Sequence, residues 1–368
     1  MWFKQSTQPS EIETTQSYLT SLLSNGYQLS IEELLPYQNK VSLINLKATK
    51  NLHNRLSGNY LSRSKGRGME FDEVRHYQTG DDIRAIDWRV TARTGKTHTK
   101  LFREEIERPV LIATDLSNTM KFGSQLLFKS VQAAHIAALV AWHGKSKGDR
   151  IGGIVFNDSK HYELKPRSRK AGVLHYLHAL TQIHANHNLK NDSKQDSTPD
   201  SNESALTQQP THVFEENCAR LRQLARPGSL VYLITDALQL TQEALRHLTY
   251  ISQHCELVVC LVSDPLEQQL PDSKTPLNVV LTDGMKRQQL TLGHADTTKA
   301  YQQQALALAT KHKSLLNKAG ARVMHYSAAL PLESQLMSQA ETSSPLEVSL
   351  ESSFETSPET QLNNGATA

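Results

Sequence analysis

The chain has 368 residues, which is enough for two or three domains of roughly 100–200 residues each. Hydrophobic residues make up only 38% of it, which suggests that polar loops or tails dilute a normal core, and the formal net charge of +3 excludes a strongly basic or acidic chain. No apolar stretch reaches the ~20 residues that a membrane helix needs, and the polar first residues do not resemble a signal peptide. We therefore expect a cytoplasmic protein without membrane insertion.

The first part of the chain, residues 1–108, is predicted to form an N-terminal helical region followed by a small charged subdomain. Helical patterns cover residues 10–24 and 31–37. The Gly- and Arg-rich residues 63–68 indicate a loop, since glycine there disfavours any regular element. No stacking aromatic side chains accompany its basic residues, so we do not expect nucleic acid as a partner. A dense run of charged residues follows.

From residue 109 to residue 328 the pattern alternates between short apolar runs and longer helical stretches. A continuous apolar run such as Val110–Thr114 is typical of a strand buried on both faces. Strands that alternate with helices predict an α/β fold with a doubly wound, mostly parallel sheet. Residues 277–292, around the turn Asp283-Gly284, predict an inserted β-hairpin. The predicted strands are 110–114, 150–156, 162–165, 230–235, 257–263 and 321–326, and the predicted helices are 125–142, 171–183, 214–224, 242–253 and 298–318.

Two stretches are predicted to be disordered. Residues 187–209 are rich in Asn, Ser, Asp and Gln, which is typical of an expanded surface loop inserted between two helices. Residues 329–368 form an acidic tail with many Ser and Thr residues and no Lys or Arg. Neither stretch has enough apolar area to offset the conformational entropy that is lost on ordering.

Acidic and hydroxyl side chains follow two of the predicted strands. Asp115, Ser117 and Thr119 come directly after the strand at 110–114, and Asp236 follows the strand at 230–235. In an open parallel sheet, ligands bind beyond the carboxyl ends of the strands. These oxygen atoms suit a hard divalent cation, so we expect Mg²⁺ or Mn²⁺ as a cofactor. The alternative is that the side chains only cap the helices that follow them.

The run Asp115–Thr119 together with Asp236 resembles the metal-ion-dependent adhesion site of von Willebrand factor A domains. The resemblance implies a Rossmann-like sheet of von Willebrand factor A type. It also implies a metal that is held by the hydroxyls and aspartates, with an open position for an acidic residue of a partner. A further ligand of that family, a threonine on an intervening loop, has no counterpart in residues 166–170, where only Ser168 could serve.

A longer motif lies upstream of the first strand. It consists of residues 68–77 (GMEFDEVRHY), 80–84 (GDDIR), 86–88 (IDW) and 92–93 (AR). The motif resembles that of the domain of unknown function family 58, bacterial proteins with a von Willebrand factor A-like domain, and the resemblance covers residues 34–326. It implies that a MoxR-type AAA+ ATPase and other von Willebrand factor A proteins are partners.

Charged side chains of both signs alternate within this motif, so bidentate Arg–carboxylate pairs are available. Two interpretations stay open: an internal network of ion pairs, centred on Arg75, Asp82, Arg84 and Asp87, or a docking surface for a partner. The residues concerned are Glu70, Arg75, Tyr77, Asp81, Asp82, Arg84, Asp87, Trp88 and Arg93.

The function that these patterns favour is a non-enzymatic protein-binding or adaptor module. An alternative is a metal-dependent phosphohydrolase of the haloacid dehalogenase type, in which Asp115 would accept the phosphoryl group. Such enzymes usually carry a second aspartate two positions later as the general acid, and here that residue is Ser117, which has no useful proton at neutral pH. A third interpretation is a scaffold whose metal site is empty.

Overall fold

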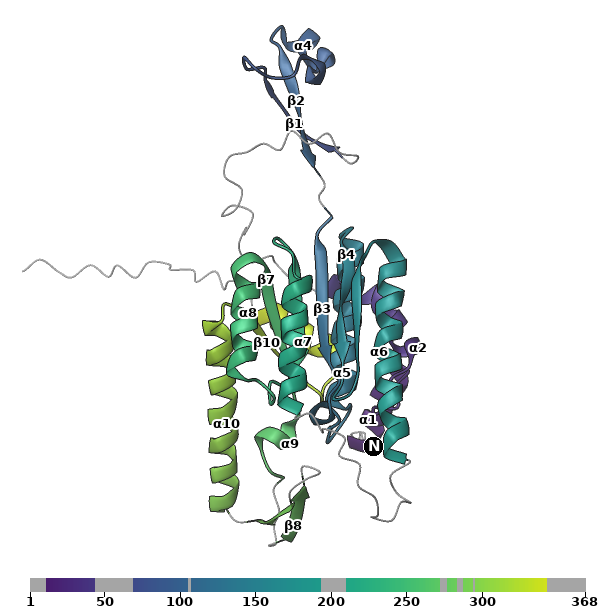
Figure 1. The fold of residues 1–368 in the computed structure, drawn as a ribbon. Coiled ribbons are helices and arrows are strands. Elements are labelled where there is room, and N and C mark those ends of the chain that lie inside the picture. Colours follow the sequence, from purple (N-terminus) through teal and green to yellow (C-terminus); the bar gives the residue numbers. More distant parts are fainter. Residues whose placement is uncertain are drawn as a thin grey trace, which may run out of the picture.

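The computed structural model describes residues 11–43, 69–104, 107–192, 210–271, 277–282, 287–293 and 295–342. Their centre is a six-stranded sheet in the order β10-β7-β6-β3-β4-β5, in which β5 runs antiparallel to β4 and the other neighbours are parallel (Figure 1). These are β3 (Pro109–Asp115), β4 (Arg150–Phe156), β5 (His161–Arg167), β6 (Leu230–Thr235), β7 (Glu256–Ser263) and β10 (Arg322–Ser327). The structure thus confirms an α/β fold with a mostly parallel sheet.

Burial explains the apolar composition of the central strands. In β3, β4 and β6 every residue after the first is buried, as expected for parallel strands that are covered on both faces. Strand β5 lies at the edge of the sheet and buries only Leu164. Because an edge strand is less covered than a central one, the sequence of β5 is less apolar than those of β3, β4 and β6.

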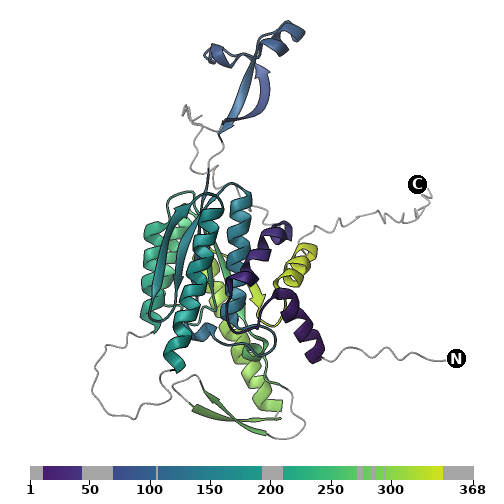
Figure 2. The same ribbon diagram turned by 90° about the vertical axis from the view of Figure 1, so that its right-hand side faces the viewer.

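Helices cover both faces of the sheet (Figures 1 and 2). The side chains of β3 alternate between the faces: Val110 and Ile112 pack in one core with residues of α5 and α6, and Leu111 and Ala113 pack in the other with residues of α7, α8 and α10. The sheet is therefore doubly wound, as predicted. The helices are α5 (Lys129–Ser146), α6 (Arg169–Asp192), α7 (Pro210–Leu224), α8 (Gln242–His254) and α10 (Ala295–Lys318).

The N-terminal helices belong to the body of the sheet domain, and not to a separate unit ending at residue 108. Leu34 and Tyr37 are buried in the same core as α5, and the side chain of Trp142 donates a hydrogen bond of 3.3 Å to the carbonyl oxygen of Leu34. A fully buried pair, Glu33 and His135, joins the same helices. The elements are α1 (Glu11–Leu22), α2 (Ile31–Leu34) and the 3-10 helix η1 (Leu35–Leu43).

The prediction of a disordered tail from residue 329 is wrong for residues 332–342, which form helix α11 (Leu332–Thr342). Leu332 and Leu336 are buried against α5 and η1, and Gln335 exchanges side-chain hydrogen bonds with the backbone of Ser327. Few apolar positions are enough to dock a helix on a core that already exists. Residues 343–368 lie outside the described part of the chain. Helix α6 likewise covers residues 187–192 of the predicted loop, and 193–209 are not described.

The charged motif forms a small subdomain beyond the end of the sheet where β3 begins (Figure 1). Strand β1 (Met69–His76) pairs antiparallel with β2 (His98–Glu104), and between them lie the 3-10 helix η2 (Ile83–Ala85) and helix α4 (Trp88–Thr94). The predicted inserted hairpin is also present, as β8 (Leu277–Thr282) paired with β9 (Arg287–Leu292). Among the described helices, none combines the length and the apolar character that crossing a membrane requires.

Candidate functional site

The acidic strand ends meet at the point where the winding of the sheet reverses. From β3 the chain passes to β4 and β5 on one side, and then returns to β6, β7 and β10 on the other. Strands β3 and β6 are therefore neighbours, with Thr114 opposite Ile234. Asp115 is the last residue of β3 and Asp236 is the first residue after β6, so both lie at the same end of the sheet. Loops diverge at such a point, which makes it the usual ligand position of an open α/β sheet.

Asp115 is a completely buried carboxyl group. One of its oxygens accepts a hydrogen bond of 2.9 Å from the backbone N–H of Ser117, and the other accepts one of 2.8 Å from the hydroxyl of Thr235. Burial, and then the nearby carboxylate of Asp236, raise the pKa of Asp115 to about 7 against the effect of these hydrogen bonds. Two carboxylates thus share one buried edge of the sheet, which favours the binding of a cation between them.

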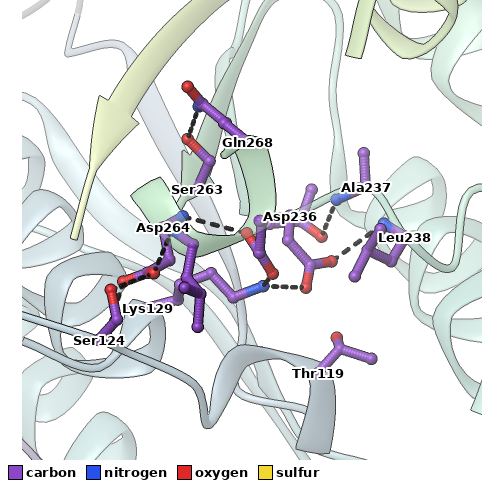
Figure 3. A network of polar contacts seen from close by, with 12 residues as sticks. Thr119, Ser124, Lys129, Asp236, Ala237, Leu238, Ser263, Asp264 and Gln268 are labelled. Carbon is purple, nitrogen blue, oxygen red and sulfur yellow. Dashed lines mark hydrogen bonds and ion pairs between the residues drawn. The ribbon is translucent and has the colours of Figure 1, made fainter. Parts of the chain in front are cut away.

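The hydroxyls of Ser117 and Thr119 lie next to each other, 3.2 Å apart, in the loop that leads from β3 into the 3-10 helix η3 (Asn118–Met120). Ser117 is buried and Thr119 is partly exposed, so the pair faces from the interior toward solvent. Figure 3 shows Thr119 below the ion pair of Lys129 and Asp236. The structure therefore brings together the four side chains that the sequence proposed as ligands.

Lys129, which the sequence analysis missed, is the central cation of this edge (Figure 3). Its side chain is fully buried at the first residue of α5, and its ammonium group lies 3.0 Å from an oxygen of Asp236 and 2.5 Å from an oxygen of Glu267. Burial acts to lower the pKa of Lys129, but the two carboxylates outweigh it, so the pKa lies above the ordinary value. The lysine is therefore charged and compensated inside the protein.

Helix α9 (Pro265–Gln268) carries Glu267 and is fastened to the loop between β3 and α5. The buried carboxylate of Asp264 accepts hydrogen bonds from the backbone N–H (2.8 Å) and the hydroxyl (2.5 Å) of Ser124. Glu267 also accepts a hydrogen bond of 3.0 Å from the N–H of Asp264, which completes a capping box. The sequence Asp264-Pro265-Leu266-Glu267 carries this capping signal, although nothing in it indicates the contact with Lys129.

Ser168, the residue considered for the remaining ligand, lies at the opposite end of the sheet, where the parallel strands begin. Because β5 is antiparallel to β4, its last residue Arg167 pairs with Ile151 near the start of β4. The hydroxyl of Ser168 donates to Glu107, at 3.4 Å. The turn that does lie at the site edge joins β4 to β5, and its Asp158 accepts a hydrogen bond of 2.7 Å from the backbone N–H of Asn118.

In the charged subdomain, the acidic side chains are used internally. Asp81 forms an ion pair of 2.8 Å with Arg75 and accepts a hydrogen bond from Gln78, while Asp82 caps η2 and Asp87 caps α4. The only hydrogen bond of the Tyr77 hydroxyl in the described residues goes to the carbonyl oxygen of Asp81, at 3.4 Å.

Two of the arginines and the tryptophan of the motif face solvent. Arg84 and Arg93 are exposed and take part in no ion pair with another described residue, and Trp88 is 67% exposed. Of the internal network that the sequence allowed, the described residues form the ion pair between Arg75 and Asp81, and Asp87 pairs with Lys100 at 3.6 Å. The side chain of Glu70 lies outside the described part of the chain.

Residues 73–313 match the model of a family described as protein of unknown function DUF58. The matched segment is well over half of the chain, and it contains strands β3 to β7 and both acidic strand ends. The chain belongs to the DUF58 family. Uncharacterized proteins of Mycobacterium bovis (Mb1516) and Mycobacterium tuberculosis (Rv1480) are each 26% identical over 220 residues, which make up 59% of this DUF58 chain and 62% of each relative. The chain thus spans less than two thirds of the length of these relatives.

Two solved structures have weaker similarity to this DUF58 chain. The conserved hypothetical protein BatB from Bacteroides thetaiotaomicron is 12% identical, with a TM-score of 0.35 over 64% of this chain and 100% of that chain. An aerotolerance-related membrane protein from Bacteroides fragilis is 13% identical, with a TM-score of 0.34 over 64% and 99%. Similarity at this level supports no statement about the DUF58 chain.

The donors around Asp115 fit a divalent ion only in part. The carboxylate of Asp115 and the hydroxyls of Ser117 and Thr119 are the hard oxygens that Mg²⁺ and Mn²⁺ prefer. The fourth expected ligand, Asp236, is already neutralised by Lys129. Within the part of the DUF58 chain that the structure describes, no group of three or more His, Cys, Asp or Glu side chains is placed to hold a metal. Together, the two carboxylates, the two hydroxyls and the ammonium group of Lys129 could pair with a charged group of either sign.

Proposed function

We propose that this DUF58 chain is a non-enzymatic protein-binding or adaptor module of von Willebrand factor A type. In this proposal, its binding site is the sheet edge formed by Asp115, Ser117, Thr119 and Asp236, and the ligand is an acidic side chain of a partner protein. The observation that carries the proposal is the convergence of buried carboxylates, hydroxyls and a cation at the point where the sheet reverses its winding.

The geometry of Asp115 argues against the phosphohydrolase alternative. A nucleophilic carboxylate needs an oxygen that is free to attack the substrate, together with a general acid nearby. Both oxygens of Asp115 accept hydrogen bonds, its side chain is not exposed, and the residue two positions later is Ser117. The same contacts hold the carboxyl group of Asp115 in one orientation, as expected for a residue that organises the loop of a binding site.

The resemblance to von Willebrand factor A proteins supplies candidates for the partner and the cofactor. They are a MoxR-type AAA+ ATPase, other von Willebrand factor A proteins, and Mg²⁺ or Mn²⁺ as the cation between site and partner. Asp115, Ser117 and Thr119 are the residues that would hold such an ion, which would supply positive charge for the partner's carboxylate. A scaffold without a metal stays the competing interpretation.

The test is a pull-down of the purified MoxR-type ATPase of the host organism with the full chain. We expect the double variant Ser117→Ala/Thr119→Ala to lose at least tenfold in affinity, because both hydroxyls at the site are removed. Thr310→Ala, which removes an exposed hydroxyl on α10, is the matched control and should bind like the wild type. Equal binding by all three chains would show that the ATPase does not use this site, and retention by none would remove the ATPase as the partner.

A further inference from the structure

The starting observation is a lysine in a place where lysine is rarely found. Lys129 is fully buried at the start of a helix whose surroundings are mostly apolar, and a buried ammonium is costly unless carboxylates compensate it. Two carboxylates do so, Asp236 from the end of β6 and Glu267 from α9. This positive charge is therefore a built-in part of the sheet edge, next to Asp236.

The two carboxylates are held very differently. The side chain of Asp236 is 3% exposed, and its second oxygen accepts a hydrogen bond of 3.0 Å from the backbone N–H of Leu238. The side chain of Glu267 is 31% exposed and belongs to a helix of four residues. Asp236 is thus the permanent counter-ion of Lys129, whereas Glu267 reaches the ammonium from the solvent side.

We propose that Lys129, and not a divalent ion, is the cation that receives the acidic side chain of a partner at this edge, and that Glu267 takes this position in the free protein. The proposal rests on the protein-binding function proposed above and names the chemistry of its site. A partner carboxylate replaces Glu267 on the ammonium group by exchange of one ion pair for another, so no charge is left uncompensated. Asp236 is then a counter-ion rather than a metal ligand.

The first experiment measures thermal unfolding of the full chain with millimolar MgCl₂ or MnCl₂, with EDTA, and with NaCl at matched ionic strength. The wild-type melting temperature should be the same in all four conditions. Lys129→Met should melt several degrees lower, because it leaves Asp236 and Glu267 without their cation, and the divalent ions should restore part of the loss. A rise in the wild-type melting temperature with Mg²⁺ that Asp236→Asn abolishes would overturn the proposal, as would a Lys129→Met chain that melts like the wild type.

The second experiment measures binding of the purified MoxR-type ATPase in EDTA. Glu267→Gln should bind several-fold more tightly than the wild type, because glutamine keeps the capping hydrogen bond to Asp264 but gives up the ion pair. The variant Lys129→Met/Asp236→Asn removes both charges of the buried pair and so keeps the fold, yet it should not bind. Binding that EDTA abolishes in the wild type would contradict the proposal. If no chain retains the ATPase in any condition, the adaptor proposal loses its partner, and the melting experiment alone decides which cation the site uses.

Discussion

At the scale of single residues, Asp115 gives the site a dependence on pH. Its pKa is about 7 in the folded protein and close to 3.8 in the unfolded chain. Between these values the folded state holds the proton more tightly, so the free energy of unfolding should fall as the pH rises from about 4 to about 7, by at most about 1.4 kcal/mol per pH unit. Above pH 7 this contribution is constant.

Urea unfolding of the wild type and Asp115→Asn across this pH range checks the prediction. Asparagine fills the same volume and does not titrate, so the variant should lack the part of the pH dependence that Asp115 causes. The difference in free energy of unfolding between the two chains should therefore change steadily between pH 4 and pH 7 and then level off. A difference that is constant over the whole range would show that Asp115 has an ordinary pKa.

The residues that the sequence could and could not indicate differ in a physical way. Asp115, Ser117, Thr119 and Asp236 were found because acidic and hydroxyl residues directly after buried strands stand out in a linear pattern. Lys129 was missed because a lysine at the start of a helix is normally an exposed residue, and only the tertiary structure places two carboxylates around it. Residue types indicate donors, but not which donors are already paired.

At the scale of elements, the charged subdomain tests whether its arginines serve folding or docking. Arg84 is exposed and forms no ion pair with a described residue, so Arg84→Ala should leave the melting temperature of the full chain unchanged. Asp87 caps α4 through the backbone N–H groups of Arg89 and Val90, so Asp87→Ala should lower it.

The same two variants belong in the ATPase pull-down. If the subdomain is a docking surface, Arg84→Ala weakens binding although it melts like the wild type. If Arg84→Ala instead melts several degrees lower, the exposed position of its side chain cannot explain the result, and a structural ion pair must be sought for it.

Helix α11 provides a second prediction for an element. Leu332 is 1% exposed in the core shared with α5, so Leu332→Ala should cost about 2–5 kcal/mol of unfolding free energy in a denaturant titration. Leu306→Ala is the matched control, because Leu306 is 68% exposed on α10 and its loss should change little. Ending the chain after residue 342 should likewise keep this stability, whereas ending it before residue 332 should not. Equal stability of all these chains would mean that α11 does not dock.

The fold was more predictable from the sequence than its details. The alternation of short apolar runs with helical stretches predicted all six strands of the main sheet. The signal is clearest in β3, β4 and β6, because a strand that is covered on both faces must be apolar throughout. The direction of β5 was not in the pattern, and it is this direction that places Ser168 at the wrong edge for a ligand. Helix α11 was missed because its composition is polar apart from the few residues that dock.

At the scale of the whole molecule, the two candidate binding surfaces lie at opposite ends of the sheet domain. The Asp115 edge is where β3 ends, beside α9, and the charged subdomain lies beyond the end where β3 begins (Figure 1). A partner that binds through an acidic side chain at the sheet edge should therefore leave the subdomain uncovered. Because the two surfaces are separate, the segment of this chain whose amides a partner protects shows which surface the partner binds.

Amide hydrogen exchange of the full chain, with and without the purified MoxR-type ATPase, is the most direct test of the sheet edge as the binding site. The proposed function predicts slower exchange in residues 116–124 and in α9 when the ATPase is bound, with residues 82–94 unchanged. The variant Lys129→Met/Asp236→Asn should show no such protection. Protection confined to residues 82–94, equal in the wild type and this variant, would contradict the account and assign binding to the charged subdomain.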